Sequence, residues 1–173
     1  MTDSRAQSTY QVRLGWGAAA LARLAEADIV VVVDAIGSPD ELAAQAVGLA
    51  GRPTVFAGSL RNATATANAV FREQLDRGGR TAINLVLAGD DGEFAVEDYL
   101  AAGAIGDALS ALGIDHSAPD VAVAAEGFRA LTRALKHLLS ASETGLRLSA
   151  DGRRDEVRAA AELDAETEAT RLA

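Results

Sequence analysis

The chain of 173 residues contains no cysteine, few aromatic residues and a single lysine, Lys136. Without cysteine, disulfide frameworks, zinc–thiolate sites and iron–sulfur clusters are excluded. Unbroken apolar runs such as residues 29–33 are far shorter than the ~20 residues that a membrane-spanning helix needs, so no membrane association is expected. Residues 1–5 lack the basic and apolar regions of a signal peptide, and a cytoplasmic location is therefore expected.

The acidic side chains outnumber the basic ones, and the formal net charge is −9. A protein that binds nucleic acid independently of sequence needs a cationic face, so the charge argues against nucleic acid as a partner. The length is that of one domain. We expect a disordered lead-in over residues 1–8, a single domain over residues 9–164 and a frayed tail over residues 165–173, where no apolar period is present.

Apolar patterning predicts alternating strands and helices. The run at residues 28–34 is apolar and β-branched on both faces, which is typical of a central strand covered by helices on both sides. Strands are predicted over residues 10–14, 28–34, 53–57 and 81–88, and helices over 18–27, 38–50, 62–77, 95–112, 119–140 and 154–163. This alternation predicts a three-layer α/β/α fold with a mostly parallel or mixed sheet and a helical C-terminal third.

Ligands of open α/β sheets bind beyond the carboxyl ends of the strands, and polar residues gather at three such ends. Asp34 directly follows the most apolar strand, where a carboxylate can hold Mg²⁺ or act in phosphoryl chemistry. From position alone, an acid that caps the following helix is an equally good interpretation.

The turn at residues 58–62 combines a glycine with the side chains of Ser59, Arg61 and Asn62. Free N–H groups at the start of a helix attract anions, and arginine binds phosphate through two parallel hydrogen bonds. Helix capping without a ligand is the simpler interpretation of the same turn.

Acidic residues cluster after the strand at residues 81–88. The cluster consists of Asp90, Asp91, Glu93, Glu97 and Asp98. Neighbouring carboxylates resist ionising together unless a cation or solvent offsets their repulsion, so the cluster could hold a divalent metal. Acids in the first turn of a helix also stabilise its dipole without any ligand.

Taken together, these segments resemble the 2-phosphosulfolactate phosphatase family. The resemblance rests on residues 58–63 (Gly-Ser-Leu-Arg-Asn-Ala), on residues 88–92 (Ala-Gly-Asp-Asp-Gly) and on residues 97–105, which begin Glu-Asp and end Ala-Gly-Ala-Ile. The opening at residues 11–17 and the closing segment at residues 145–164 also fit. The resemblance implies a magnesium-dependent phosphatase of α/β type that hydrolyses the phosphomonoester of 2-phospho-3-sulfolactate.

The resemblance also implies roles for individual residues. It assigns catalysis to Asp34, Glu97 and Asp98, binding of a small anionic phosphoester to Ser38, Ser59, Arg61 and Asn62, and Mg²⁺ binding to Asp34, Asp91 and Asp98.

Two segments depart from the family pattern and leave an alternative open. After Asp34 the family usually continues with a threonine-rich run, but here Ser38 is the sole hydroxyl residue of that segment. The short segment 48–54 also stands where the family has a long middle section. The alternative is a catalytically degenerate paralogue that binds a small anion or a protein partner. A sheet shortened in this way could expose an edge that a second copy covers in a homodimer.

Overall fold

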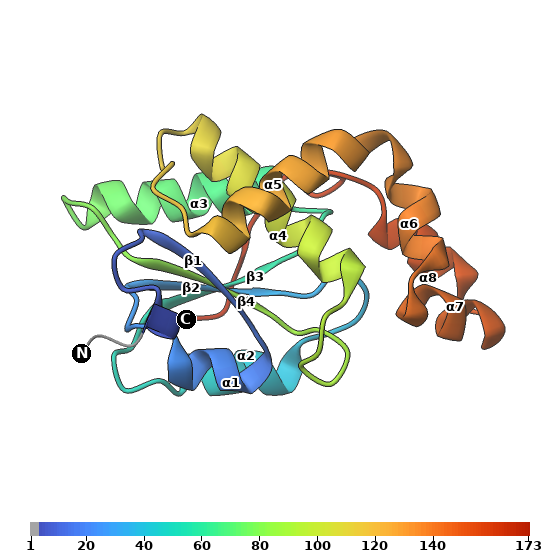
Figure 1. The fold of residues 1–173 in the computed structure, drawn as a ribbon, viewed down its shortest axis with the longest axis horizontal. Coiled ribbons are helices and arrows are strands. Elements are labelled where there is room, and N and C mark those ends of the chain that lie inside the picture. Colours follow the sequence, from blue (N-terminus) through green and yellow to red (C-terminus); the bar gives the residue numbers. More distant parts are fainter. Residues whose placement is uncertain (1–3) are drawn as a thin grey trace.

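The computed structural model describes residues 4–173, which form a five-stranded mixed sheet between layers of helices (Figure 1). The strand order is β1-β4-β2-β3-β5. The strands are β1 (Val12–Trp16), β2 (Ile29–Val33), β3 (Thr54–Gly58), β4 (Ile83–Leu87) and β5 (Thr170–Arg171). The first four run parallel, and β5 pairs antiparallel with β3. The expected three-layer α/β fold is confirmed.

The core lies on both faces of the sheet, because β2 is apolar and fully buried along its length. On one face, α3 (Ala63–Asp76), α4 (Val96–Ala111) and α5 (Pro119–Leu131) pack over the larger apolar cluster. On the other face, α1 (Gly17–Arg23) and α2 (Asp40–Val47) cover the smaller one (Figure 1).

Helices α4 and α5 approach each other closely at Gly103. A Cβ atom placed on Gly103 would lie 2.2 Å from the carbonyl oxygen of Ala124 on α5. Such contact with backbone cannot be relieved by turning a side chain. Glycine therefore sets the distance between α4, which carries candidate site residues, and the helix outside it.

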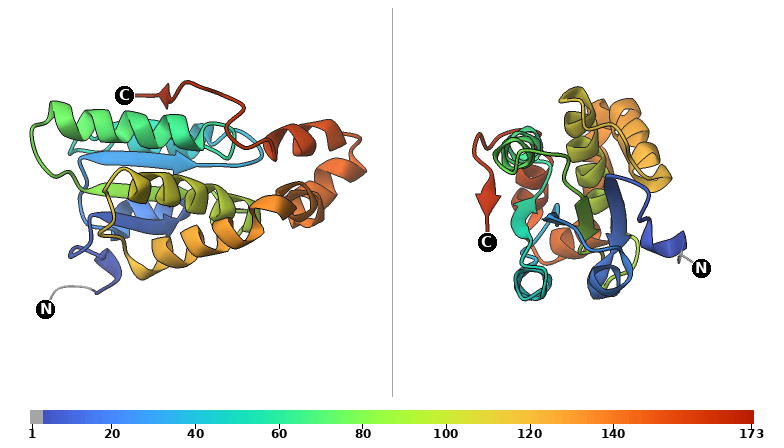
Figure 2. Two further views of the ribbon diagram at one scale, coloured as in Figure 1. Left: turned by 90° about the horizontal axis from the view of Figure 1, so that it is seen from above. Right: turned by 90° about the vertical axis from the view of Figure 1, so that its left-hand side faces the viewer.

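The helical C-terminal third extends past the carboxyl ends of the parallel strands (Figure 2). It contains the 3-10 turn η2 (Thr132–Ala134), α6 (Leu135–Ala141), α7 (Glu143–Ala150) and α8 (Arg154–Ala160). The helix expected over residues 119–140 is thus interrupted by η2. Helix α7 was not expected from the apolar pattern. It is preceded by the N-cap residue Ser142, whose side chain accepts a hydrogen bond from the Gly145 N–H.

Polar contacts link the C-terminal residues to α3 and β3. Asp164 accepts hydrogen bonds from the N–H and hydroxyl of Thr64 at the start of α3. Further on, Arg171 of β5 donates to Glu73 and lies over the ring of Phe56. These contacts join segments far apart in the sequence, so no local period reveals them.

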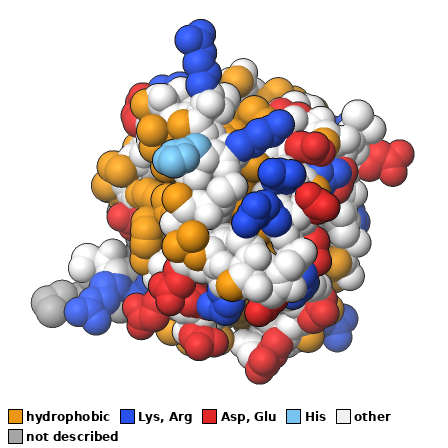
Figure 3. Space-filling model, turned by 90° about the vertical axis from the view of Figure 1, so that its right-hand side faces the viewer, with side chains coloured by type: hydrophobic (Ala, Val, Ile, Leu, Met, Phe, Trp, Pro, Cys, Tyr) orange, Lys and Arg blue, Asp and Glu red, His pale blue; other side chains and the backbone are white. Residues whose placement is uncertain are grey.

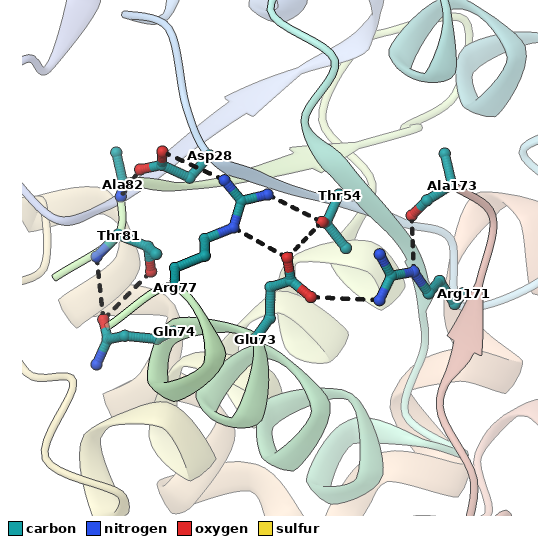
Figure 4. Close-up of polar contacts among 9 residues, drawn as sticks. All are labelled: Asp28, Thr54, Glu73, Gln74, Arg77, Thr81, Ala82, Arg171 and Ala173. Atoms are coloured by element: carbon teal, nitrogen blue, oxygen red, sulfur yellow. Dashed lines mark hydrogen bonds and ion pairs between the residues drawn. The ribbon is translucent and has the colours of Figure 1, made fainter. Parts of the chain in front are cut away.

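Glu73 is the centre of a network of hydrogen bonds and ion pairs beside Thr54, the first residue of β3 (Figure 4). Its carboxylate accepts from Thr54, Arg77 and Arg171, and Arg77 also pairs with Asp28. The network ties α3, β3 and the C-terminal strand together.

The described part of the N-terminal lead-in, from residue 4 onwards, contacts β1. Residues 4–6 form the 3-10 turn η1 (Ser4–Ala6), and the Gln7 side chain bonds both backbone groups of Leu14. Residues 1–3 of that prediction lie outside the described part. Within residues 4–173, no helix has both the length and the apolarity needed to cross a membrane.

Candidate active site

The four parallel strands end side by side, which creates one polar edge. In the strand register Trp16 of β1 pairs with Leu87 of β4, Leu87 pairs with Val33 of β2, and Val33 pairs with Gly58 of β3. The loops that follow these residues therefore start at the same level. The polar segments expected at three of these ends are brought to one edge.

Asp98 joins two of these loops to α4. It lies in the first turn of the helix and is only 3% exposed. One carboxylate oxygen, Oδ1, accepts the N–H of Ala35 at 2.7 Å, and Oδ2 accepts the N–H of Gly89 at 2.8 Å. Asp98 thus fixes the loop after β2 and the loop after β4 at once.

Asp34 follows β2 directly, as predicted, and its carboxylate bonds the backbone of the turn that comes after it in the chain. Its Oδ1 accepts the N–H of Ile36 at 3.1 Å. A Cβ atom on Gly37, which has a φ of +138°, would come within 3.3 Å of Asp34 Oδ2. Glycine at position 37 therefore keeps the space beside this carboxylate clear.

Glu97 is the third carboxylate, and it is 4% exposed. Its side chain accepts no hydrogen bond from any other residue in the described part of the chain. Its carboxylate oxygens are not among the fully buried polar atoms that lack a partner, so they reach the protein surface. Glu97 therefore has capacity to bind a cation or a donor that the protein does not itself supply.

The three carboxylates act on one another electrostatically. Burial raises the pKa of Asp98 to about 7; the N–H groups of Ala35 and Gly89 oppose this rise, and the charges of Asp34 and Glu97 add to it. Burial also raises the pKa of Asp34, with the charge of Glu97 acting in the same direction. The site accumulates negative charge, which a bound cation would offset.

The turn after β3 is held by the Asn62 side chain. Asn62 Oδ1 accepts the N–H of Ser59 at 2.8 Å, and its Nδ2 donates to the Ala57 carbonyl. The Ser59 hydroxyl accepts the N–H of Arg61 at 3.1 Å. Asn62 thus shapes the backbone, while Ser59 lies at the strand end.

The Arg61 guanidinium is committed to the C-terminal segment. It donates to Glu162, to Glu166 and to the Ala159 carbonyl, at 2.7–3.0 Å. The hydrogen bonds to the two glutamates raise the pKa of Arg61. An anion at the turn would therefore have to compete with two carboxylates for this side chain.

Two further predicted site residues, Ser38 and Asp91, have contacts other than the three carboxylates. The Ser38 hydroxyl donates to Asp40, the first residue of α2, which starts two residues after the beginning of the helix expected over residues 38–50. Asp91 has a φ of +50° and lines a hollow of about 250 Å³ with residues of α1 and α2, including Glu41. Among residues 4–173, no group of three or more His, Cys, Asp or Glu side chains has an arrangement suited to a metal ion.

An aromatic cluster beside this edge was not predicted. Trp16 at the end of β1 contacts Phe94 and Tyr99, which flank the start of α4, with ring centroids 5.3 and 6.1 Å away. All three are visible in the sequence, but only the strand order brings β1 next to β4. Figure 3 shows the face of the molecule at the end where the C-terminal helices lie, and this face carries both acidic and basic side chains.

A family model described as 2-phosphosulpholactate phosphatase matches residues 42–168, most of the chain. The chain belongs to this family. The match includes the turn with Ser59 and the helix start with Glu97 and Asp98, whereas Asp34 and Ser38 precede it. Among curated proteins, none matches the chain. The resemblance described from the sequence is therefore confirmed at the level of the family.

Proposed function

We propose that the chain is a magnesium-dependent phosphatase that hydrolyses a small phosphomonoester of the 2-phosphosulfolactate type to the hydroxy acid and phosphate. The observation that carries the proposal is the gathering of Asp34, Glu97 and Asp98 at one sheet edge, where their charges act on one another and the Glu97 carboxylate accepts no hydrogen bond from the described residues. Family membership supports the phosphatase class.

Electrostatics favour a cation in this reaction. A phosphomonoester carries negative charge, and three neighbouring carboxylates would repel it. The Arg61 guanidinium is already paired with two glutamates. A divalent cation between the carboxylates and the phosphate would turn this repulsion into attraction.

The residues present fit Mg²⁺ by the chemistry of their donors, since Mg²⁺ is bound in proteins through one or two carboxylates together with substrate phosphate. Asp34, whose Oδ2 accepts no hydrogen bond from the described residues, and Glu97 would hold the ion. When bound, Mg²⁺ would offset charge on the phosphoryl and leaving oxygens. We do not assign Asp91 to this set, because the hollow that it lines includes none of the three carboxylates.

The remaining residues would position the loops of the site and bind the phosphoester. Asp98 would keep the loops after β2 and β4 at a fixed spacing through its two backbone hydrogen bonds. The Ser59 hydroxyl and the turn that Asn62 shapes would contact the phosphate or its organic group. Ser38 would bind the phosphoester only after its hydrogen bond to Asp40 breaks, and Arg61 only after its ion pairs with the two glutamates break.

The test is phosphate release from 2-phosphosulfolactate and from p-nitrophenyl phosphate, with and without Mg²⁺. We expect Mg²⁺-dependent turnover that falls at least 100-fold in Asp34→Asn and in Glu97→Gln, the range for loss of one electrostatic group at a reacting phosphate. The matched control is Asp155→Asn, a carboxylate on α8 that is 97% exposed and should leave turnover unchanged. Binding of phosphate without turnover of either ester would instead support the degenerate, anion-binding alternative.

A further inference from the structure

We propose that Trp16, Phe94 and Tyr99 form an aromatic platform that receives a flat apolar group of the phosphomonoester, so that the site accepts ring-bearing phosphate esters in addition to compact ones. The inference rests on the proposed function for its location, but it concerns the organic part of the ligand. It commits the platform to one occupant, a single aromatic ring attached to a phosphate or phosphonate.

The cluster holds three of the seven aromatic residues in this aromatic-poor chain. Ring centroids lie 5.3 Å apart for Trp16 and Phe94, 5.6 Å for Phe94 and Tyr99 and 6.1 Å for Trp16 and Tyr99. These are favourable separations for aromatic contacts. Phe94 is nevertheless 61% exposed, so it offers ring surface to a ligand.

The rings are held by the backbone around them. Asp90 and Glu93 bond each other's backbone in both directions, which closes the loop just before Phe94. The Tyr99 hydroxyl donates to the carbonyl of Asp120 at the start of α5. Because β1 fixes Trp16, the platform is prearranged and a ligand would order few side chains on binding.

The platform adjoins the carboxylate site through Gly89. A Cβ atom on Gly89 would lie 3.2 Å from Trp16 Cε3, and the Gly89 N–H is the group that Asp98 binds. Trp16 and Asp34 end strands on either side of β4. Two strand spacings place these ends ~10 Å apart. A phosphate at the carboxylates and a directly attached ring can bridge that span.

The ligand chemistry follows from what each half offers. The carboxylates with their cation favour an oxyanion, and the platform favours a planar apolar face, which stacks on aromatic side chains. A compact ester without a ring would bind only at the carboxylates and their cation and would not contact the aromatic platform. The ring should therefore strengthen binding, and the gain should depend on Phe94.

Calorimetry at fixed Mg²⁺ concentration tests this with two ligands that cannot be hydrolysed, phenylphosphonate and methylphosphonate. We expect phenylphosphonate to bind about tenfold more tightly, the size of one favourable aromatic contact. Phe94→Ala should reduce the ratio of the two affinities to near one. Leu75→Ala is the matched control, since Leu75 is 59% exposed and lies at the far end of α3, and the ratio should stay unchanged.

Fluorescence gives a second readout because Trp16 is the only tryptophan. Phenylphosphonate should change its emission saturably, and methylphosphonate should change it much less. Equal affinities for the two ligands, no binding of either, or an unchanged ratio in Phe94→Ala would overturn the inference. So would a dimer that Phe94→Ala converts to a monomer without affecting the ratio, since a second copy would then be the occupant. Ring-dependent binding without ester hydrolysis would retain the platform and reject only the proposed function.

Discussion

Two opposing effects act on the pKa of a single residue, Asp98. Its carboxylate accepts two backbone N–H groups, which favour the ionised form, yet burial and the charges of Asp34 and Glu97 raise its pKa to about 7. The unfolded chain should show an ordinary pKa near 4. Between these values the folded state binds more protons than the unfolded state, so the free energy of unfolding must fall as pH rises.

We therefore predict that, with EDTA present, Asp98 reduces the free energy of unfolding by up to about 1.4 kcal/mol per pH unit between pH 4 and 7. Asp98→Asn should lose this contribution, because the amide does not titrate. Urea unfolding of both proteins at pH 5 and 7 measures the difference. Parallel pH dependence in the two proteins would contradict the assignment. Saturating Mg²⁺ should flatten the wild-type dependence, since a cation favours the ionised carboxylates.

Arg61 is the residue whose predicted role as a phosphate clamp stays a prediction. Its hydrogen bonds to Glu162, Glu166 and the Ala159 carbonyl give it a structural role that joins α3 to the end of α8. We expect Arg61→Ala to lower the free energy of unfolding by about 1 kcal/mol, a modest value because the ion pairs are partly exposed. Urea denaturation provides the measurement.

The same variant separates the two roles of Arg61 by kinetics. If Arg61 acts only through packing and ion pairs, kcat/KM for a phosphoester should change less than threefold. A loss of 100-fold with an unchanged free energy of unfolding would show that the guanidinium leaves its glutamates to bind phosphate.

Among the packed elements, the close contact between α4 and α5 gives a direct test of how packing stabilises the fold. Gly103→Ala places a methyl group against the Ala124 carbonyl, and we predict a loss of about 1–3 kcal/mol in the free energy of unfolding. Gly127→Ala on α5 is the matched control because a Cβ there meets nothing within 4 Å. It should be neutral or stabilise by up to about 1 kcal/mol. Equal effects of the two substitutions on thermal unfolding would contradict the packing account.

The elements divide by how far local pattern could predict them. Strand β2 and the acidic start of α4 are visible in the sequence because β-branched runs and first-turn acids act locally. Strand β5 is not, because Thr170 and Arg171 are ordered by β3 and Glu73 across the chain. Helix α7 is also not visible in the sequence, because it has only eight residues and packs against other helices of the C-terminal third.

At the scale of the whole molecule, topology decides what forms the site. The sequence indicates Asp34 and the pair Glu97 and Asp98, but only the adjacency of β2 and β4 makes them neighbours. Adjacency of β1 and β4 likewise brings Trp16 to Phe94, which no spacing in the sequence reveals. The contacts of Ser38 with Asp40, and of Asp91 with the hollow beside α1 and α2, are likewise not visible in the sequence.

If Asp34 and Glu97 form one cation site, the metal-free protein must bind Mg²⁺, and a calorimetric titration measures this binding. We predict saturable binding of one Mg²⁺ that Glu97→Gln weakens at least tenfold and Asp155→Asn leaves unchanged. No binding of Mg²⁺, or equal affinity in the wild type and Glu97→Gln, would contradict it.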